Sequence, residues 1–118
     1  MLSITGSERV YLACGNTDMR HSIDGLAAIV QQCFQLDPFS SSLFVFCNRN
    51  KTMIKILHWE YNGFWLYFRR LEKGTFKWPA DQSTQTILVG NRELNWLLTG
   101  LSLEQKQAHK KVDAKAVI

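Results

Sequence analysis

Apolar residues recur along this chain at two different spacings, and the spacing predicts which segments form helices. Between residues 23 and 35 the apolar positions lie three and four residues apart, which is typical of one face of a helix. Thr17 or Ser22 can cap this helix through its hydroxyl group. Residues 92–101 repeat the spacing with four leucines, and Asn91 stands at the capping position. We therefore expect two amphipathic helices.

Shorter apolar runs between and around these helices predict β-strands. We expect strands at residues 9–14, 43–48, 53–59, 64–70, 75–79 and 86–89. The Asn62-Gly63 pair favours a two-residue hairpin loop, and Gly74 fits the left-handed position of a three-residue loop before residues 75–79. The four middle runs therefore predict an antiparallel meander.

A loop at Asn62-Gly63 also predicts which residues share a face of this meander. It pairs Trp59 with Leu66 on one face and His58 with Tyr67 on the other. We expect the first face to be the core face. The second face then presents aromatic rings beside a cation, from Trp65, Tyr67, His58 and Arg69.

Together these elements predict one α+β domain over residues 1–103, with a meander of about five to six strands packed against two helices. A chain of 118 residues that is 46% hydrophobic can bury a core without disulfides or a structural metal. Residues 104–118 are polar and basic, and we expect a flexible tail there. The tail is either solvated or an additional phosphate-binding arm.

The composition argues against a membrane or secreted protein. The longest apolar runs are five residues, whereas a membrane span needs about 20. No basic and apolar leader stands at the start of the sequence, so we expect no signal peptide. The three cysteines, Cys14, Cys33 and Cys47, show no C-x-x-C spacing, so neither a disulfide framework nor a zinc knuckle is expected. These features favour a cytoplasmic location.

The positive charge of the chain is concentrated in its middle third. Residues 43–79 carry seven basic and two acidic residues, and they also hold three of the four tryptophans. Cations can contact phosphates and flat rings can stack on bases, so this mixture favours a nucleic-acid surface. The candidate contacts are Arg49, Lys51, Lys55, Trp65, Tyr67, Arg69, Arg70, Lys73 and Lys77. The alternative is that the aromatic rings cover a sheet face and the charged loops serve only solubility.

No catalytic constellation is visible in the sequence. The histidines are scattered, with no metal-ligand spacing, and the phosphate-binding glycine motifs and the G-x-S-x-G motif are missing. Asp18 and Asp24 are better explained as residues near a helix N-terminus than as an acid pair. We therefore expect a protein that is not an enzyme and that needs neither a cofactor nor a metal.

Several segments, taken in order, resemble one known family. They are VYLACG at 10–15, TDMR at 17–20, IDGLAA at 23–28, LDPFS at 36–40, LFVFCNR at 43–49, IKIL at 54–57, NGFWLY at 62–67 and RLEKGTFKWP at 70–79. Together they are similar to the accessory protein TnpB, the second open reading frame of insertion-sequence family 66. This family is unrelated to the much longer RNA-guided nuclease that shares the name TnpB.

The resemblance implies a bacterial mobile-element protein that assists transposition beside a separate DDE transposase. It carries over no catalytic residues. Our first hypothesis is a DNA-associated factor that binds double-stranded element DNA largely without sequence preference, together with the transposase or a second copy of itself. The alternative is a protein adaptor that binds the transposase without contacting DNA.

Overall fold

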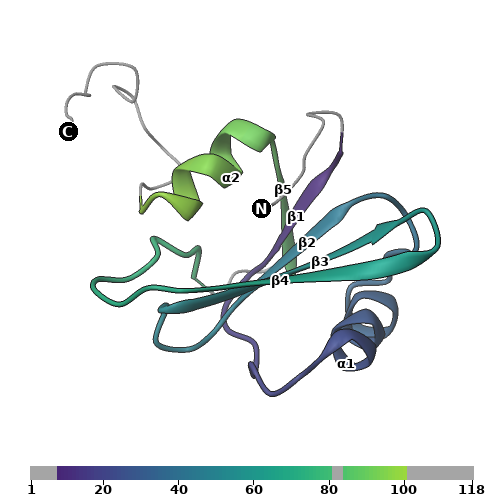
Figure 1. Cartoon of the computed structure of the whole chain (residues 1–118), viewed down its shortest axis with the longest axis horizontal. Helices are drawn as coiled ribbons and strands as arrows, with labels where there is room; N and C mark the ends of the chain where they lie inside the picture. Colours follow the sequence, from purple (N-terminus) through teal and green to yellow (C-terminus); the bar gives the residue numbers. More distant parts are fainter. Residues whose placement is uncertain (1–7, 81–83, 101–118) are drawn as a thin grey trace.

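A computed structural model describes residues 8–80 and 84–100 of the chain. One five-stranded sheet lies between two helical layers, with α1 against one face and α2 against the other (Figure 1). The elements are β1 (Val10–Ala13), α1 (Ile23–Ala28), the π-helix η1 (Ile29–Cys33), β2 (Leu43–Cys47), β3 (Met53–Glu60), β4 (Gly63–Arg70), β5 (Thr86–Val89) and α2 (Asn91–Leu98). This architecture confirms the α+β class. The tail at 104–118 lies outside the described residues.

The strand order of the sheet is β4-β3-β2-β1-β5. Strands β2, β3 and β4 form the expected antiparallel meander. Strand β1 instead pairs parallel to β2, because α1 and η1 carry the chain back across the sheet between them. Strand β5 then adds antiparallel to β1. The meander therefore has three strands, and β4 and β5 are the edges of the sheet.

The strand predicted at residues 75–79 is wrong. After β4 the chain turns back toward the β2–β3 loop, where Leu71 N donates to Thr52 O at 2.8 Å and Phe76 N donates to Lys51 O at 2.7 Å. Phe76 and Trp78 then enter the core on the α2 face. Gly74 does have the expected positive φ of 76°. The alternating apolar residues are thus buried over a sheet face rather than in a sixth strand.

The predicted hairpin register is also wrong, although the residues share faces as predicted. The prediction of a single core face is wrong too, because His58 is buried and Tyr67 packs against the core on the second face. The loop is Tyr61-Asn62, so Glu60 pairs with Gly63 and Trp59 pairs with Phe64. Partners on β4 shift by two residues, and side chains alternate with a period of two, so every residue keeps its face. Packing explains the shift, since the Trp59 and Phe64 rings meet edge to face with centroids 5.0 Å apart.

The core lies in two layers on either side of the sheet. Strand β2 is buried along its whole length and contributes Phe44 and Phe46 to the α1 side, where they meet Leu26 and Val30. On the α2 side, Val10, Leu12, Leu43, Val45, Ile54, Ile56, Leu94 and Leu97 pack with Phe76 and Trp78. No helix among the described residues is long and apolar enough to cross a membrane.

Both predicted helix caps differ in the structure. Ser22 precedes α1, but its hydroxyl makes no capping hydrogen bond. Helix α2 begins one residue earlier than expected, because Gly90 occupies the cap position and Asn91 is already helical. The Gly90 N–H donates to Glu93 Oε1 at 3.1 Å, so a carboxylate in the first turn replaces the expected amide cap.

Candidate nucleic-acid interface

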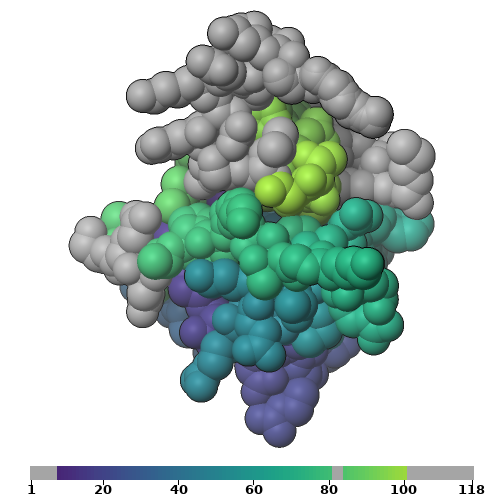
Figure 2. All heavy atoms as spheres, turned by 90° about the vertical axis from the view of Figure 1, so that its left-hand side faces the viewer, coloured from purple at the N-terminus to yellow at the C-terminus, as the bar shows by residue number. Residues whose placement is uncertain are grey.

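Three segments bring most of the predicted cations together at one end of the sheet. They are the β2–β3 loop, the last residues of β4, and the chain from 71 to 77. The two hydrogen bonds from Leu71 and Phe76 hold the third segment against the first. Figure 2 views the molecule toward this end. We call this surface the basic end, and its exposed cations are Arg49, Lys51, Arg69, Arg70, Lys73 and Lys77.

A buried asparagine shapes the β2–β3 loop. The Asn48 side-chain oxygen accepts from Thr52 N at 2.8 Å and Met53 N at 2.9 Å, and its nitrogen donates to Thr52 Oγ1 at 3.1 Å. Lys51 adopts a positive φ of 61° within this loop. The loop is thus held from inside, while Arg49 and Lys51 stay exposed. Sequence reasoning missed Asn48, although an asparagine directly after a strand is a common turn signal.

Two carboxylates near the basic end each pair with an arginine. Glu72 lies 3.0 Å from Arg70, and Asp18 lies 2.7 Å from Arg20 in the neighbouring loop. Hydrogen bonds from the Arg20 side chain and backbone lower the pKa of Asp18 to about 2. Among the residues that the structure describes, no ion pair involves Arg49, Lys51, Arg69, Lys73 or Lys77. These five cations are available for an anionic partner.

Lys55 is held away from the basic end. Its Nζ donates to the carbonyl oxygens of Met19 and His21, both at 2.8 Å, and the side chain is half-buried. These bonds anchor the connection between β1 and α1 onto β3. The structure therefore gives Lys55 a role in holding the fold, and we leave it out of the interface.

The aromatic pair on β4 lies toward the hairpin loop rather than at the basic end. The rings of Trp65 and Tyr67 stack with centroids 6.0 Å apart, and Tyr67 packs against the core on the α2 side. Trp65 is 52% exposed, and its Nε1 donates to Glu60 Oε1 at 2.8 Å. A carboxylate beside the indole disfavours phosphate, so this pair is a poor site for stacked nucleotides.

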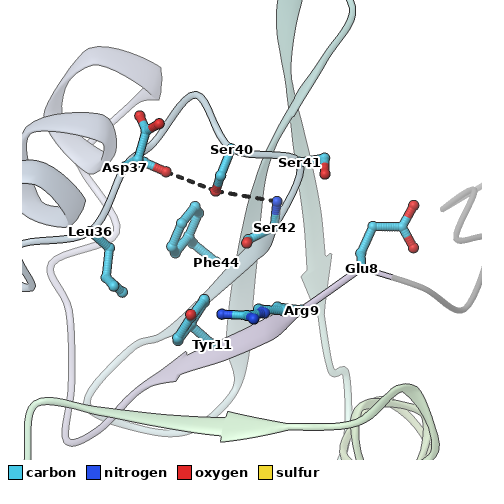
Figure 3. Close-up of a pocket in the computed structure, with 9 residues that line it drawn as sticks. All are labelled: Glu8, Arg9, Tyr11, Leu36, Asp37, Ser40, Ser41, Ser42 and Phe44. Carbon is cyan, nitrogen blue, oxygen red and sulfur yellow. Dashed lines mark hydrogen bonds between the residues drawn. The ribbon is translucent and has the colours of Figure 1, made fainter.

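An open pocket lies between the start of β1 and the loop that follows η1 (Figure 3). Arg9, Tyr11 and Phe44 line it beside the turn at Asp37. The polar groups of this turn bind one another: Phe39 N donates to Asp37 Oδ1 and Ser40 Oγ donates to Asp37 O, both at 2.9 Å. Within residues 8–80 and 84–100, no cluster of three or more His, Cys, Asp or Glu residues forms a metal site. In this pocket the Asp37 carboxylate and the Ser40 hydroxyl are thus engaged within their own turn.

The fold and surface define a small α+β protein with one strongly basic end. Comparison with known families places the chain among the IS66 Orf2-like proteins, and it belongs to that family, whose model matches residues 8–108. The expected resemblance is thereby confirmed. Membership supports a transposition-related accessory role, and the family is not a known catalytic one.

Two curated relatives come from Sinorhizobium fredii. Uncharacterized protein y4hO is 34% identical over 107 residues, which cover 91% of this chain and 92% of the relative. Uncharacterized protein y4jC is 30% identical over 93 residues, which cover 79% of each chain. No solved structure matches.

Proposed function

We propose that the protein is a DNA-associated transposition accessory factor that contacts the phosphate backbone through its basic end. The observation that carries this proposal is the convergence of six exposed cations from three segments. These segments contain one carboxylate, Glu72, which pairs with Arg70. Lysine and arginine at such a density attract the phosphates of duplex DNA. The accessory role of the family supplies the setting, since transposition takes place on DNA.

The arrangement favours contacts to phosphates over the reading of bases. Helix α2 packs Leu94 and Leu97 into the core, and α1 has an acidic residue, Asp24, in its first turn. Helix α1 has no basic residue, and α2 has one, Arg92, whose guanidinium lies over the Trp96 ring. Neither helix therefore offers the several basic side chains that a recognition helix places in the major groove. We therefore expect binding to double-stranded DNA with little sequence preference. In this proposal the strand-cutting chemistry belongs to the separate DDE transposase.

A matched pair of double variants tests the proposal. Arg49 and Lys73 are changed to Ser in one variant, and Arg9 and Arg92 are changed to Ser in the other. All four residues are exposed, and both variants lose two positive charges. Affinity for a labelled duplex is measured by fluorescence anisotropy over a range of salt concentrations.

We expect the basic-end variant to lose about tenfold or more in affinity and to reduce the log–log salt slope by roughly two, since each phosphate contact contributes about 0.9. The control variant should keep most of its affinity and its slope. Equal losses in the two variants would show that net charge alone acts. If the wild-type protein binds no DNA at low salt, the proposal fails and the adaptor that docks on the transposase becomes the better account.

A further inference from the structure

We propose that two copies of the chain pair through the outer edge of β4, antiparallel and related by a two-fold axis perpendicular to the sheet. This pairing joins two five-stranded sheets into one continuous sheet. The inference does not rest on the proposed DNA contact, because it is argued from the free backbone edge of β4. The two surfaces share Arg69 and Arg70 at the end of this strand, so dimerisation is measured on DNA-free protein.

The outer edge of β4 has unused backbone hydrogen-bonding groups. In the β3–β4 ladder, the odd-numbered residues of β4 direct their backbone N–H and C=O groups toward β3. The bond from Leu71 N to Thr52 O shows this alternation, because Leu71 continues the odd-numbered series. Phe64, Leu66, Phe68 and Arg70 therefore direct their N–H and C=O groups away from β3. Among the described strands none pairs with this edge. The eight-residue strand has no proline, lysine or bulge to protect this edge, and its charged residues, Arg69 and Arg70, lie at its last two positions.

Large apolar side chains flank this edge on both faces of the sheet. Trp65 is 52% exposed on the α2 face, and Phe68 is 54% exposed on the α1 face. Aromatic residues at such positions are typical anchors of protein interfaces. A strand added beside β4 would cover both side chains at once, whereas a ligand on one face of the sheet would cover only one.

The charges near β4 identify a second copy as the partner. A carboxylate, Glu60, lies at the hairpin end of the strand, and Arg69 and Arg70 lie at its other end. An antiparallel copy brings each basic end beside the acidic end of its partner, and the two-fold axis repeats the match. The strand is therefore complementary to itself in the antiparallel direction.

One register uses all of the outward-facing backbone groups. With Tyr67 on the two-fold axis, Leu66 lies opposite Phe68 and Phe64 lies opposite Arg70, so all four outward residues are paired. The same register places Arg69 opposite Trp65. The guanidinium then lies beside the indole and near the Glu60 carboxylate that the indole N–H binds. A register centred on Leu66 places Arg69 opposite Gly63 and loses this contact.

The mass of the DNA-free protein tests the pairing. By light scattering after size exclusion, the full chain should have twice its monomer mass of 13.6 kDa. Phe68→Pro should give the monomer mass, because it removes an outward N–H and no bond to β3. Phe68→Thr keeps that N–H and is the control, which should still dimerise. Circular dichroism verifies that both variants fold. A wild-type monomer at high concentration, or an unaffected dimer in Phe68→Pro, would overturn the proposal.

Cross-linking tests the register. Opposite residues on the axis have Cα atoms about 4.5 Å apart, which suits a disulfide. In a Cys33→Ser background, Tyr67→Cys should form a disulfide-linked dimer under mild oxidation, whereas Leu66→Cys should not. The reverse result would overturn the register and the contact between Arg69 and Trp65.

A charge exchange tests the electrostatic match. Glu60→Arg and Arg69→Glu should each weaken dimerisation by about tenfold, and the double variant should recover most of that loss. Equal weakening in all three variants would show that charge complementarity does not select the partner. The readout remains the mass of DNA-free protein, so failure here leaves the proposed DNA contact unaffected.

Discussion

Trp78 and Trp65 stand in similar aromatic and basic segments, yet their surroundings are opposite. Trp78 is 5% exposed, lies in the core over a sheet face, and donates from Nε1 to Ala13 O at 2.9 Å. Trp65 is 52% exposed on an edge strand, and its Nε1 binds the carboxylate of Glu60. The comparison teaches that the regular strand carries the exposed indole, and the irregular segment carries the buried one. Only the exposed indole is free to meet a partner.

Replacing each tryptophan by alanine tests this comparison most strongly. Trp78→Ala should lower the free energy of unfolding by about 3–5 kcal/mol, because it leaves a cavity and removes a buried hydrogen bond. Trp65→Ala should cost the monomer less than about 1.5 kcal/mol, since half of its surface already contacts water. Urea denaturation at a protein concentration that keeps the chain monomeric measures both. Similar losses would show that the edge is as tightly packed as the core.

The buried thiol of Cys47 makes the stability of the core depend on pH. Burial raises its pKa from 9.0 to about 11. A thiol whose pKa is raised by folding contributes its full stabilisation while the pH is below its ordinary pKa of 9.0. This contribution disappears as the pH rises toward 11. We expect a fall of up to about 3 kcal/mol in the free energy of unfolding between these values.

Denaturation of the wild-type protein and of Cys47→Ala at several alkaline pH values isolates this contribution. The alanine variant should be less stable at neutral pH and should lose less stability as the pH rises. Thiol labelling adds a second readout, because exposed Cys33 should react rapidly and Cys47 only on unfolding. Rapid labelling of both thiols would contradict the closed core.

Lys55 and Lys51 contrast a cation that holds the fold with one that can bind DNA. Lys55→Ala should lower the free energy of unfolding by about 1–3 kcal/mol, because the carbonyls of Met19 and His21 lose a charged donor. Lys51→Ala, at the exposed loop, should cost less than about 0.5 kcal/mol. Lys51→Ala should weaken DNA binding more than Lys55→Ala does. A Lys55 variant that keeps its stability and loses DNA binding would return Lys55 to the interface.

Local patterns predicted the elements well and their long-range pairings poorly. The apolar runs located both helices and all five strands of the sheet, including the buried β2, because the spacing of apolar residues follows which side chains are buried. The parallel pairing of β1 with β2 depends on where the crossover packs, which no local pattern contains. Residues 75–79 show a strand-like alternation, but the return of the chain to Lys51 places them over the sheet instead.

The candidate site was predictable where charge is local in sequence. The cations of the basic end fall within residues 49–77, so composition alone located them. The role of Lys55 was not visible, because its acceptors lie 34 and 36 residues away in the chain. The separation of the basic end from the aromatic pair Trp65 and Tyr67 could be seen only in the folded sheet. There the hairpin places Trp65 and Arg70 toward opposite ends of β4.

The smallest expected effect concerns the hairpin loop at the end of the edge strand. Tyr61 holds a positive φ of 67° with its side chain 97% exposed, so it bears a backbone cost and gains little packing. Tyr61→Gly should raise the free energy of unfolding by about 0.5–1 kcal/mol, after the greater freedom of glycine in the unfolded chain is counted. Asn62→Gly is the control and should give no gain, because Asn62 does not have a positive φ. If only Tyr61→Gly raises the stability, the packing of Trp59 on Phe64 holds the loop at Tyr61-Asn62, one residue before the Asn-Gly pair. If Asn62→Gly raises it instead, the register with the loop at Asn62-Gly63 is the correct one.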